Sequence, residues 1–493
     1  MSRVLFSIGV VQVLIVLVGI GRSKVLSVLL GPAGFGVVST IDQVALTLVH
    51  LGTLSVPFTA MKFMSHSHSD GLKAFQRTYR SFLRILTLLV VTATTLATAI
   101  LAWWPGFFGR DLFALSLPLH IAILGVPALA LNNFFINTLA AAQRPSSAAG
   151  LSLLATLMLA VAAIVGERVG GLSGLYVATV FAGVLTTAGT LVYLHRSLGL
   201  RLAGPAESLL RELRQRPEFI SYSAYFYLLL SAYSLTMLAT RYYVFSRLGA
   251  AEAGLLQALL SVALTVGAVL APMSNLFLSP LLNRRLPAPD KVRAANDFAG
   301  KTLVLLLLAS LPVILFPQIV LATLFSGRFV AGANSLFLFV LWQCLFQVVN
   351  VYQQLLIGLD DVLFVSVAAL AGFGTAALLA PVLVSALGLG GAAMALTIGM
   401  AVYGVVAAVR LRARFASGLP VGFLIRLGYV LVVVLMAGSI LNTSTELSLV
   451  GMAERFAFAL AALGIFWMLL GSEERHFVSS GFGLLPHRPR VRP

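Results

Sequence analysis

Long apolar segments alternate with short polar ones along the whole chain. Most apolar runs reach about 20 residues, the length that a helix needs to cross the hydrocarbon core of a bilayer. The polar stretches between them are too short to form a separate soluble domain. We therefore predict an all-α polytopic membrane protein with about 14 transmembrane helices. The predicted spans cover residues 4–29, 35–63, 79–102, 114–141, 146–166, 171–195, 219–247, 252–279, 298–322, 331–358, 362–386, 389–410, 421–441 and 451–471.

The composition supports this fold class. Of the 493 residues, 59% are hydrophobic and only 10% are charged, and the mean hydropathy is +1.00. Soluble domains typically carry about 25% charged residues, so a soluble protein with a large core is excluded. The first apolar run, residues 4–20, lacks an obvious cleavage site, and we interpret it as a retained span. The single cysteine, Cys344, lies in an apolar run and is interpreted as a packed thiol.

The net charge of +17 does not indicate a nucleic-acid-binding protein. The basic residues lie between apolar runs, not on one soluble face, so anionic membrane lipids are their expected partners. With the N-terminus inside, 25 of the 33 lysines and arginines fall in inner loops or inner span ends. The outer loops hold only Arg110, Arg168, Arg247, Arg328 and Arg455. This asymmetry predicts that both termini are cytoplasmic.

Several segments recur at a nearly constant spacing. "LLGPAGFG" (29–36) corresponds to "RLGAAEAG" (247–254), "NNFFINTLAAAQR" (132–144) to "NVYQQLLIGLDD" (350–361), and "GGLSGLYVATV" (170–180) to "GLGGAAMALTI" (388–398). The offset is 217 or 218 residues in each case, and Arg22 corresponds to Arg241 at an offset of 219. Six predicted spans separate the copies, so both copies enter the membrane from the same side. A parallel repeat of this kind places a central pathway between two lobes.

The repeat divides the chain into domains. We expect an N-lobe at 1–203 (spans 1–6), a cytoplasmic amphipathic linker at 204–218 and a C-lobe at 219–414 (spans 7–12). Two accessory spans, 13 and 14, follow at 415–472, and a basic cytoplasmic tail occupies 473–493. The linker carries leucines on one side and arginines on the other, which is typical of an interfacial helix, although a solvated basic loop also fits its composition.

Three cations interrupt apolar runs at depth. Arg22 lies about 25 Å along the first span, and Lys24 follows about 200° around the helix. Arg241 takes the equivalent depth in the second repeat. A charge inside a bilayer costs several kcal/mol unless it faces water, a counter-ion or the bundle interior. Snorkelling to the interface or pairing with Asp42 explains these cations structurally, whereas a shared cationic site predicts an anionic ligand. The planar fork of arginine suits phosphate or pyrophosphate.

Other polar residues within spans form a second set of candidates. Asp42 either pairs with Arg22 or Lys24 or carries a coupling proton or sodium ion. The candidate residues for the cavity or for coupling are Asp42, His50, Lys62, Asn133, Gln257 and Asn350. Their structural alternatives are a packed histidine, a snorkelling lysine and interhelical amide hydrogen bonds. The sequence contains no nucleotide-binding, metal-ligand or nucleophile motif, so we expect no catalytic residues, no metal and no cofactor.

The motif residues resemble a known family. Arg22 and Lys24 before "LGPAGFG", Lys62 near the end of span 2, the arginine before "LGxxxxG" at span 8 and the 6+6+2 arrangement are similar to the multidrug/oligosaccharidyl-lipid/polysaccharide (MOP) exporter superfamily. Within it, the chain resembles the Wzx-type polysaccharide flippases. The likeness covers spans 1–12 and is clearest at 22–62 and 241–257.

The resemblance implies a V-shaped, two-lobed, MATE/MOP-like membrane transporter and not an enzyme. It implies movement of undecaprenyl-pyrophosphate-linked oligosaccharide, such as an O-antigen unit, across a bacterial inner membrane by alternating access. Arg22, Lys24 and Arg241 become pyrophosphate-binding cations, and a glycan polymerase and chain-length proteins become candidate partners. A lipid II flippase and a cation-coupled multidrug antiporter remain alternatives. The drug-exporting branch uses an acidic residue within its lobes, and here the first span has none and Glu218 lies only at the edge of the seventh.

Overall fold

The computed structural model describes residues 2–103, 115–201, 217–268, 270, 274, 278–282, 286–415, 419–441 and 449–479. All regular secondary structure in these residues is helical. Ten helical segments within the described ranges are long and apolar enough to cross a membrane. The predicted class, an all-α polytopic membrane protein, is confirmed.

Three of these segments are too long for a single crossing. They are α1 (Ser2–Thr53), α7 (Pro145–Leu198) and α16 (Val362–Phe415). A straight helix of 54 residues would extend about 80 Å, more than twice a hydrocarbon core of about 30 Å. Each segment breaks at glycine, because the break requires a positive φ of 63° at Gly31, 58° at Gly171 and 58° at Gly388.

The breaks reverse the chain, so each long segment contributes two spans. In α7, a side chain at Gly166 would meet the backbone of Gly174, eight residues later, which is possible only when the helix folds back on itself. Counting α1, α7 and α16 twice gives thirteen spans among the described residues. The 32-residue helix α9 (Pro217–Leu248), which carries more polar side chains, makes fourteen.

Each of the remaining helices except α19 overlaps a predicted span. They are α2 (Val56–Ser69), α3 (Leu72–Trp103), α5 (Ser116–Leu124), α6 (Val126–Ala141), α10 (Ala250–Ala268), α12 (Ser279–Leu282), α13 (Ala288–Leu315), α14 (Pro317–Leu324), η3 (Gly327–Gly332), α15 (Ala333–Gly358), α17 (Val421–Leu441), α18 (Leu449–Leu469) and α19 (Ser472–Ser479). The second span differs from its prediction: it is interrupted by left-handed residues Leu54 and Ser55 and continues as α2 to Ser69.

The backbone repeats itself at the predicted spacing. Gly31 and Gly249 both have positive φ, 63° and 96°, at an offset of 218. At an offset of 217, Gln143 (φ 56°) corresponds to Asp360 (φ 58°), and Gly171 to Gly388. Non-glycine residues rarely adopt positive φ, so the shared turn at Gln143 and Asp360 is strong structural support for the internal repeat.

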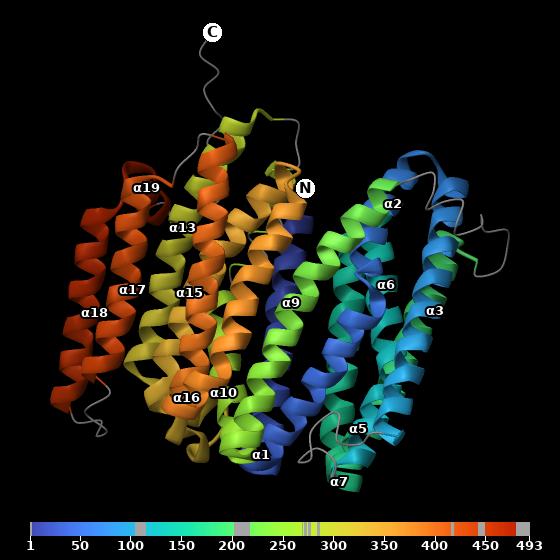
Figure 1. Ribbon diagram of the computed structural model, residues 1–493, viewed down its shortest axis with the longest axis horizontal. Coiled ribbons are helices and arrows are strands. Elements are labelled where there is room, and N and C mark those ends of the chain that lie inside the picture. Colours follow the sequence, from blue (N-terminus) through green and yellow to red (C-terminus); the bar gives the residue numbers. More distant parts are fainter. Residues whose placement is uncertain are drawn as a thin grey trace.

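Two groups of helices lie side by side in Figure 1. Helices α2, α3, α5, α6 and α7 form one group, and α10, α13, α15, α16, α17 and α18 form the other, with α1 and α9 running between them. The groups meet where α1 packs against α10. A side chain at Gly36 would collide with the backbone at Ala250 and Gly254, and one at Gly254 would collide with Pro32. The repeated glycines Gly36 and Gly254 thus allow the closest approach between the two groups.

The predicted domain limits are only partly within the described residues. The linker expected at 204–218 lies outside them except for Pro217 and Glu218, at the start of α9. The first residues of the tail expected at 473–493 belong to α19, and residues 480–493 lie outside the described part. Arg455, counted above with the outer loops, is instead a buried residue of α18 with 2% of its surface exposed.

Candidate functional site

Arg22 and Asp42 lie on opposite sides of the break in α1. Because the chain reverses at Gly31, residues 20 positions apart come together: an Arg22 guanidinium nitrogen lies 3.2 Å from Asp42 Oδ2. The side chains are 33% and 39% exposed. The hydroxyl of Tyr176 on α7 lies 3.0 Å from Asp42 Oδ1, to which it donates. The carboxylate is thereby fixed between the arginine and the tyrosine, and one counter-ion is already present beside Arg22.

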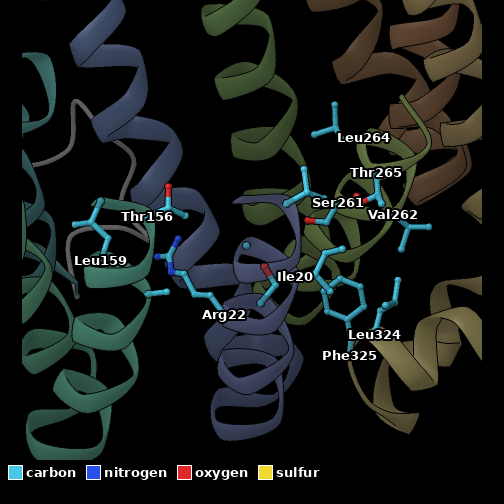
Figure 2. Close-up of a pocket in the computed structure, with 14 residues that line it drawn as sticks. Ile20, Arg22, Thr156, Leu159, Ser261, Val262, Leu264, Thr265, Leu324 and Phe325 are labelled. Carbon is cyan, nitrogen blue, oxygen red and sulfur yellow. Dashed lines mark hydrogen bonds between the residues drawn. The ribbon is translucent and has the colours of Figure 1, made fainter. Parts of the chain in front are cut away.

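Arg22 also lines a cavity between the helix groups. The cavity has a volume of about 380 Å³, within the range of small-molecule sites. Its lining comes from α1, α7, α10 and α14, and its residues are Val16, Gly19, Ile20, Arg22, Ser23, Thr156, Leu159, Ala160, Ser261, Val262, Leu264, Thr265, Leu324 and Phe325. Arg22 is the charged member of this lining. Figure 2 shows its guanidinium directed toward Thr156 and Leu159, with Leu324 and Phe325 on the other side of α1.

Arg241 is not among the lining residues, but two hydrogen bonds link it to one of them. It donates to Oε1 of Gln257, and Nε2 of Gln257 donates to the hydroxyl of Ser261 at 3.0 Å. Ser261 is a lining residue. The two repeat-related arginines are therefore connected to one cavity, Arg22 directly and Arg241 through Gln257 and Ser261.

Lys24 takes a different direction. Its Nζ donates to the backbone carbonyl of Ala322 on α14 at 3.1 Å, and it is not among the residues that line the cavity. Figure 2 likewise places Leu324 and Phe325, the neighbours of Ala322, across α1 from Arg22. In this conformation the Lys24 side chain therefore links α1 to α14. Its predicted role in holding pyrophosphate stays a prediction.

The other predicted side chains lie away from this cavity. His50 is half-buried on α1, and within the described residues its Nδ1 has no hydrogen-bond partner. Lys62 is exposed on α2, with its Nζ 4.0 Å from the centroid of the Tyr222 ring on α9. Asn133 is exposed on α6 and accepts a hydrogen bond from Asn137 at 3.3 Å. Asn350 is half-buried on α15.

Several residues near the cavity were not predicted. Tyr176, Ser261, Thr156 and Thr265 are ordinary members of apolar spans in the sequence, and each is spaced far from Arg22 along the chain. Ser261 and Thr265 are four residues apart, so they lie on one face of a helix. This spacing was the sequence signal that could have identified them. Among the described residues, no group of three or more His, Cys, Asp and Glu side chains is placed to hold a metal ion.

The fold matches that of known membrane transporters. A lipid II flippase, MurJ, in an inward closed conformation, superposes with a TM-score of 0.69 at 10% identity, covering 94% of this chain and 98% of that one. An inward-facing multidrug resistance MATE family transporter of the MOP superfamily gives 0.65 at 14% identity, with 84% and 98% covered. A Vibrio cholerae MATE transporter gives 0.58 at 15% identity, with 84% and 97% covered.

At the level of sequence, no protein-family model matches the chain, and no curated protein matches it. The chain thus has a MATE/MurJ-like fold, the fold of those multi-pass membrane transporters. The resemblance to the Wzx-type branch rests on the motif residues alone.

Proposed function

We propose that the protein is a flippase that moves undecaprenyl-pyrophosphate-linked oligosaccharide, an O-antigen or related surface-glycan unit, from the inner to the outer leaflet. The observation that carries this proposal is the cavity that Arg22 lines and to which Arg241 is linked through Gln257 and Ser261. Two cations in a low-dielectric site favour a ligand with more than one negative charge. A pyrophosphate supplies such a charge in a form that guanidinium groups bind with paired hydrogen bonds.

The cavity walls fit the other parts of such a ligand. Thr156, Ser261 and Thr265 offer hydroxyl groups to the first sugar. The exposed Leu264 of α10 lines the cavity, and the exposed Leu17 follows the lining residue Val16 on α1. Exposed apolar residues of a membrane protein face lipid, so the polyprenyl tail has a path out between these helices. Rocking of the two helix groups about the Gly36–Gly254 contact then alternates access to the site. Asp42 balances Arg22 while the site is empty, and it is also the candidate for proton or sodium coupling.

The proposal extends to location and domains. The lysine and arginine asymmetry supports cytoplasmic termini, the family resemblance implies a bacterial inner membrane, and the repeat supports lobes at 1–203 and 219–414. Lipid-linked oligosaccharide and membrane lipids are then its partners, with a glycan polymerase and chain-length proteins acting on the delivered product.

A lipid II flippase is the second candidate function. The MurJ structure covers 94% of this chain, whereas the MATE structures cover 84%. The larger coverage favours a flippase over a drug exporter, because α17 and α18 add two spans to the twelve of the lobes. A cationic cavity is also poorly suited to the cationic substrates of a cation-coupled antiporter.

Glycan display in a strain that lacks the gene tests the proposal. Complementation with Arg22→Ala or Arg241→Ala should fail at normal protein levels, whereas Arg412→Ala, which removes an exposed arginine at the end of α16, should restore display. Normal display with both cavity variants overturns the pyrophosphate role. Rescue of a peptidoglycan-flippase deletion favours the lipid II alternative, and drug resistance without a glycan phenotype favours the antiporter.

A further inference from the structure

The accessory helix α18 carries a buried arginine that contacts a break in the ninth span. Arg455 is 2% exposed, and its Nη1 donates to the backbone carbonyl of Leu315 at 2.7 Å. Its guanidinium carbon also lies 5.7 Å from the centroid of the Phe316 ring. A buried charge is costly unless it is bound, so a residue held in this way has a specific structural task.

The contacted carbonyl lies where the helix is interrupted. Helix α13 ends at Leu315, Phe316 has φ −127° and ψ 51°, and Pro317 begins α14. The last carbonyls of a helix have no partner within it, and proline cannot donate to them. Arg455 supplies a charge-assisted donor for one such carbonyl and covers the adjacent ring. The break is therefore bound from outside by the accessory helix.

The short helix after this break forms part of the candidate site. Leu324 at its end and Phe325 line the cavity with Arg22, and the carbonyl of Ala322 accepts the hydrogen bond from Lys24. The Phe325 ring lies 5.9 Å from the Phe35 ring of α1, centroid to centroid. Helix α14 thus contacts α1 beside the cavity, in addition to the packing of α1 against α10.

We propose that Arg455 is a positioning residue for transport: by holding the α13–α14 break, it sets the angle at which α14 meets Lys24 and closes the cavity. The role in transport rests on the proposed function, whereas the positioning itself does not. The Lys24–Ala322 bond links α1 to α14 and must break when these two helices separate at this end. The accessory span α18 therefore acts on the central site through α14, although it lies outside the repeat.

Hydrogen–deuterium exchange of the full-length protein tests the inference without any substrate. Arg455→Met should speed exchange of the α14 amides about tenfold or more, the effect of losing one hydrogen bond to a charged group. Exchange in α5 and α6 should stay unchanged. Arg455→Lys keeps a charged donor and should restore most of the protection. If Arg455→Met cannot be purified, Arg455→Gln is measured by the same criteria.

Two comparisons separate positioning from general stability. Arg426→Met removes a shielded arginine from the other accessory helix, where it pairs with Glu474 of α19, and it should leave α14 exchange unchanged. The double variant Lys24→Met/Arg455→Met should speed α14 exchange less than the product of the single effects, because both residues hold the same helix.

Three results overturn the inference: unchanged α14 exchange in Arg455→Met, equal acceleration throughout the second helix group, or strictly multiplicative effects in the double variant. Binding of undecaprenyl pyrophosphate to the wild-type protein is measured in parallel. If the wild-type protein does not bind this ligand, the proposed function is contradicted. The exchange result still tests the positioning role of Arg455 separately.

Discussion

The two arginines that the repeat places at equivalent positions have different partners. Arg22 lies against the carboxylate of Asp42, whereas Arg241 donates to the neutral amide of Gln257. The residue that corresponds to Asp42 in the second repeat is Leu260, so the second arginine has no matching acid. The repeat has preserved the positions of the cations and changed their electrostatic balance. Arg241 is consequently the cation whose charge is less fully neutralised in the empty protein.

The same divergence occurs at the paired turns before spans 5 and 11. Gln143 and Asp360 share a left-handed conformation, but the next residues are Arg144 and Asp361, of opposite charge. Asp361 accepts hydrogen bonds or ion pairs from Arg410 and Arg414 at 2.7 Å each. The two copies of the repeat thus share their backbone conformation at this turn but not their charged residues. The role of each copy therefore depends on its own contacts.

The largest effect is expected for Arg241→Met. Loss of the less neutralised cation removes one or two charge-assisted hydrogen bonds, so the Kd for undecaprenyl pyrophosphate should rise about tenfold to a hundredfold. Arg241→Lys, which keeps the charge but loses the planar fork, should give an intermediate Kd. An equal Kd for wild type and Arg241→Met would contradict the larger contribution to binding that we expect from Arg241.

Asp42→Asn should act in the opposite direction. Removing the carboxylate frees Arg22 and takes a negative charge away from the cavity, so the Kd for the same ligand should fall about threefold to tenfold. The isosteric Tyr176→Phe variant, which removes only the hydroxyl that contacts Asp42, serves as the control with a smaller change. Tighter binding combined with abolished flipping identifies Asp42 as the coupling residue, and weaker binding contradicts its role as a competing counter-ion.

Lys24→Met should change ligand binding by less than about threefold, because its ammonium contacts Ala322 and does not line the cavity. Its effect should appear instead in the conformational equilibrium, as faster thiol labelling of a cysteine placed at Ser23 in a protein whose Cys344 is replaced. A tenfold loss of binding in Lys24→Met returns this residue to the pyrophosphate site.

Asp361→Asn should leave binding unchanged and lower stability. Burial alone would raise the pKa of Asp361, but the hydrogen bonds from Arg410 and Arg414 outweigh it and hold the pKa below its usual value. Its stabilising contribution is therefore present above pH about 4 and lost as pH falls through the lowered pKa. We expect a loss of about 1–2 kcal/mol at pH 7, measured by thermal unfolding in detergent. Arg412→Ala, on the exposed side of α16, is the control that should have no effect.

Much of the fold was predictable because apolar length and lysine–arginine patterning act locally along the chain. The repeat was also predictable, since Gly31, Gly171 and Gly388 are needed wherever the backbone turns with positive φ. The interruption at Leu54 and Ser55 was missed because neither residue favours a left-handed conformation, and tertiary packing overrides that preference there.

The site was predictable only in part. Charges in apolar runs are visible in a sequence, so Arg22, Asp42 and Arg241 were candidates from the sequence, and their role in binding a ligand stays a prediction. The direction of the Lys24 side chain was not predicted. Helical phase alone does not tell which neighbour a side chain meets across a chain reversal. Arg455 was counted with the outer loops because it lies near the end of a predicted span. The sequence did not show that its side chain contacts the backbone break at Leu315.

The proposed function requires that Arg22 and Arg241 bind one pyrophosphate. Its most direct test is the Kd of the purified full-length protein for undecaprenyl pyrophosphate, by native mass spectrometry, in wild type, both single methionine variants and the double variant. We predict that each single variant weakens binding about tenfold or more and that the double variant is weaker than either. Wild-type affinity in the double variant would contradict the claim.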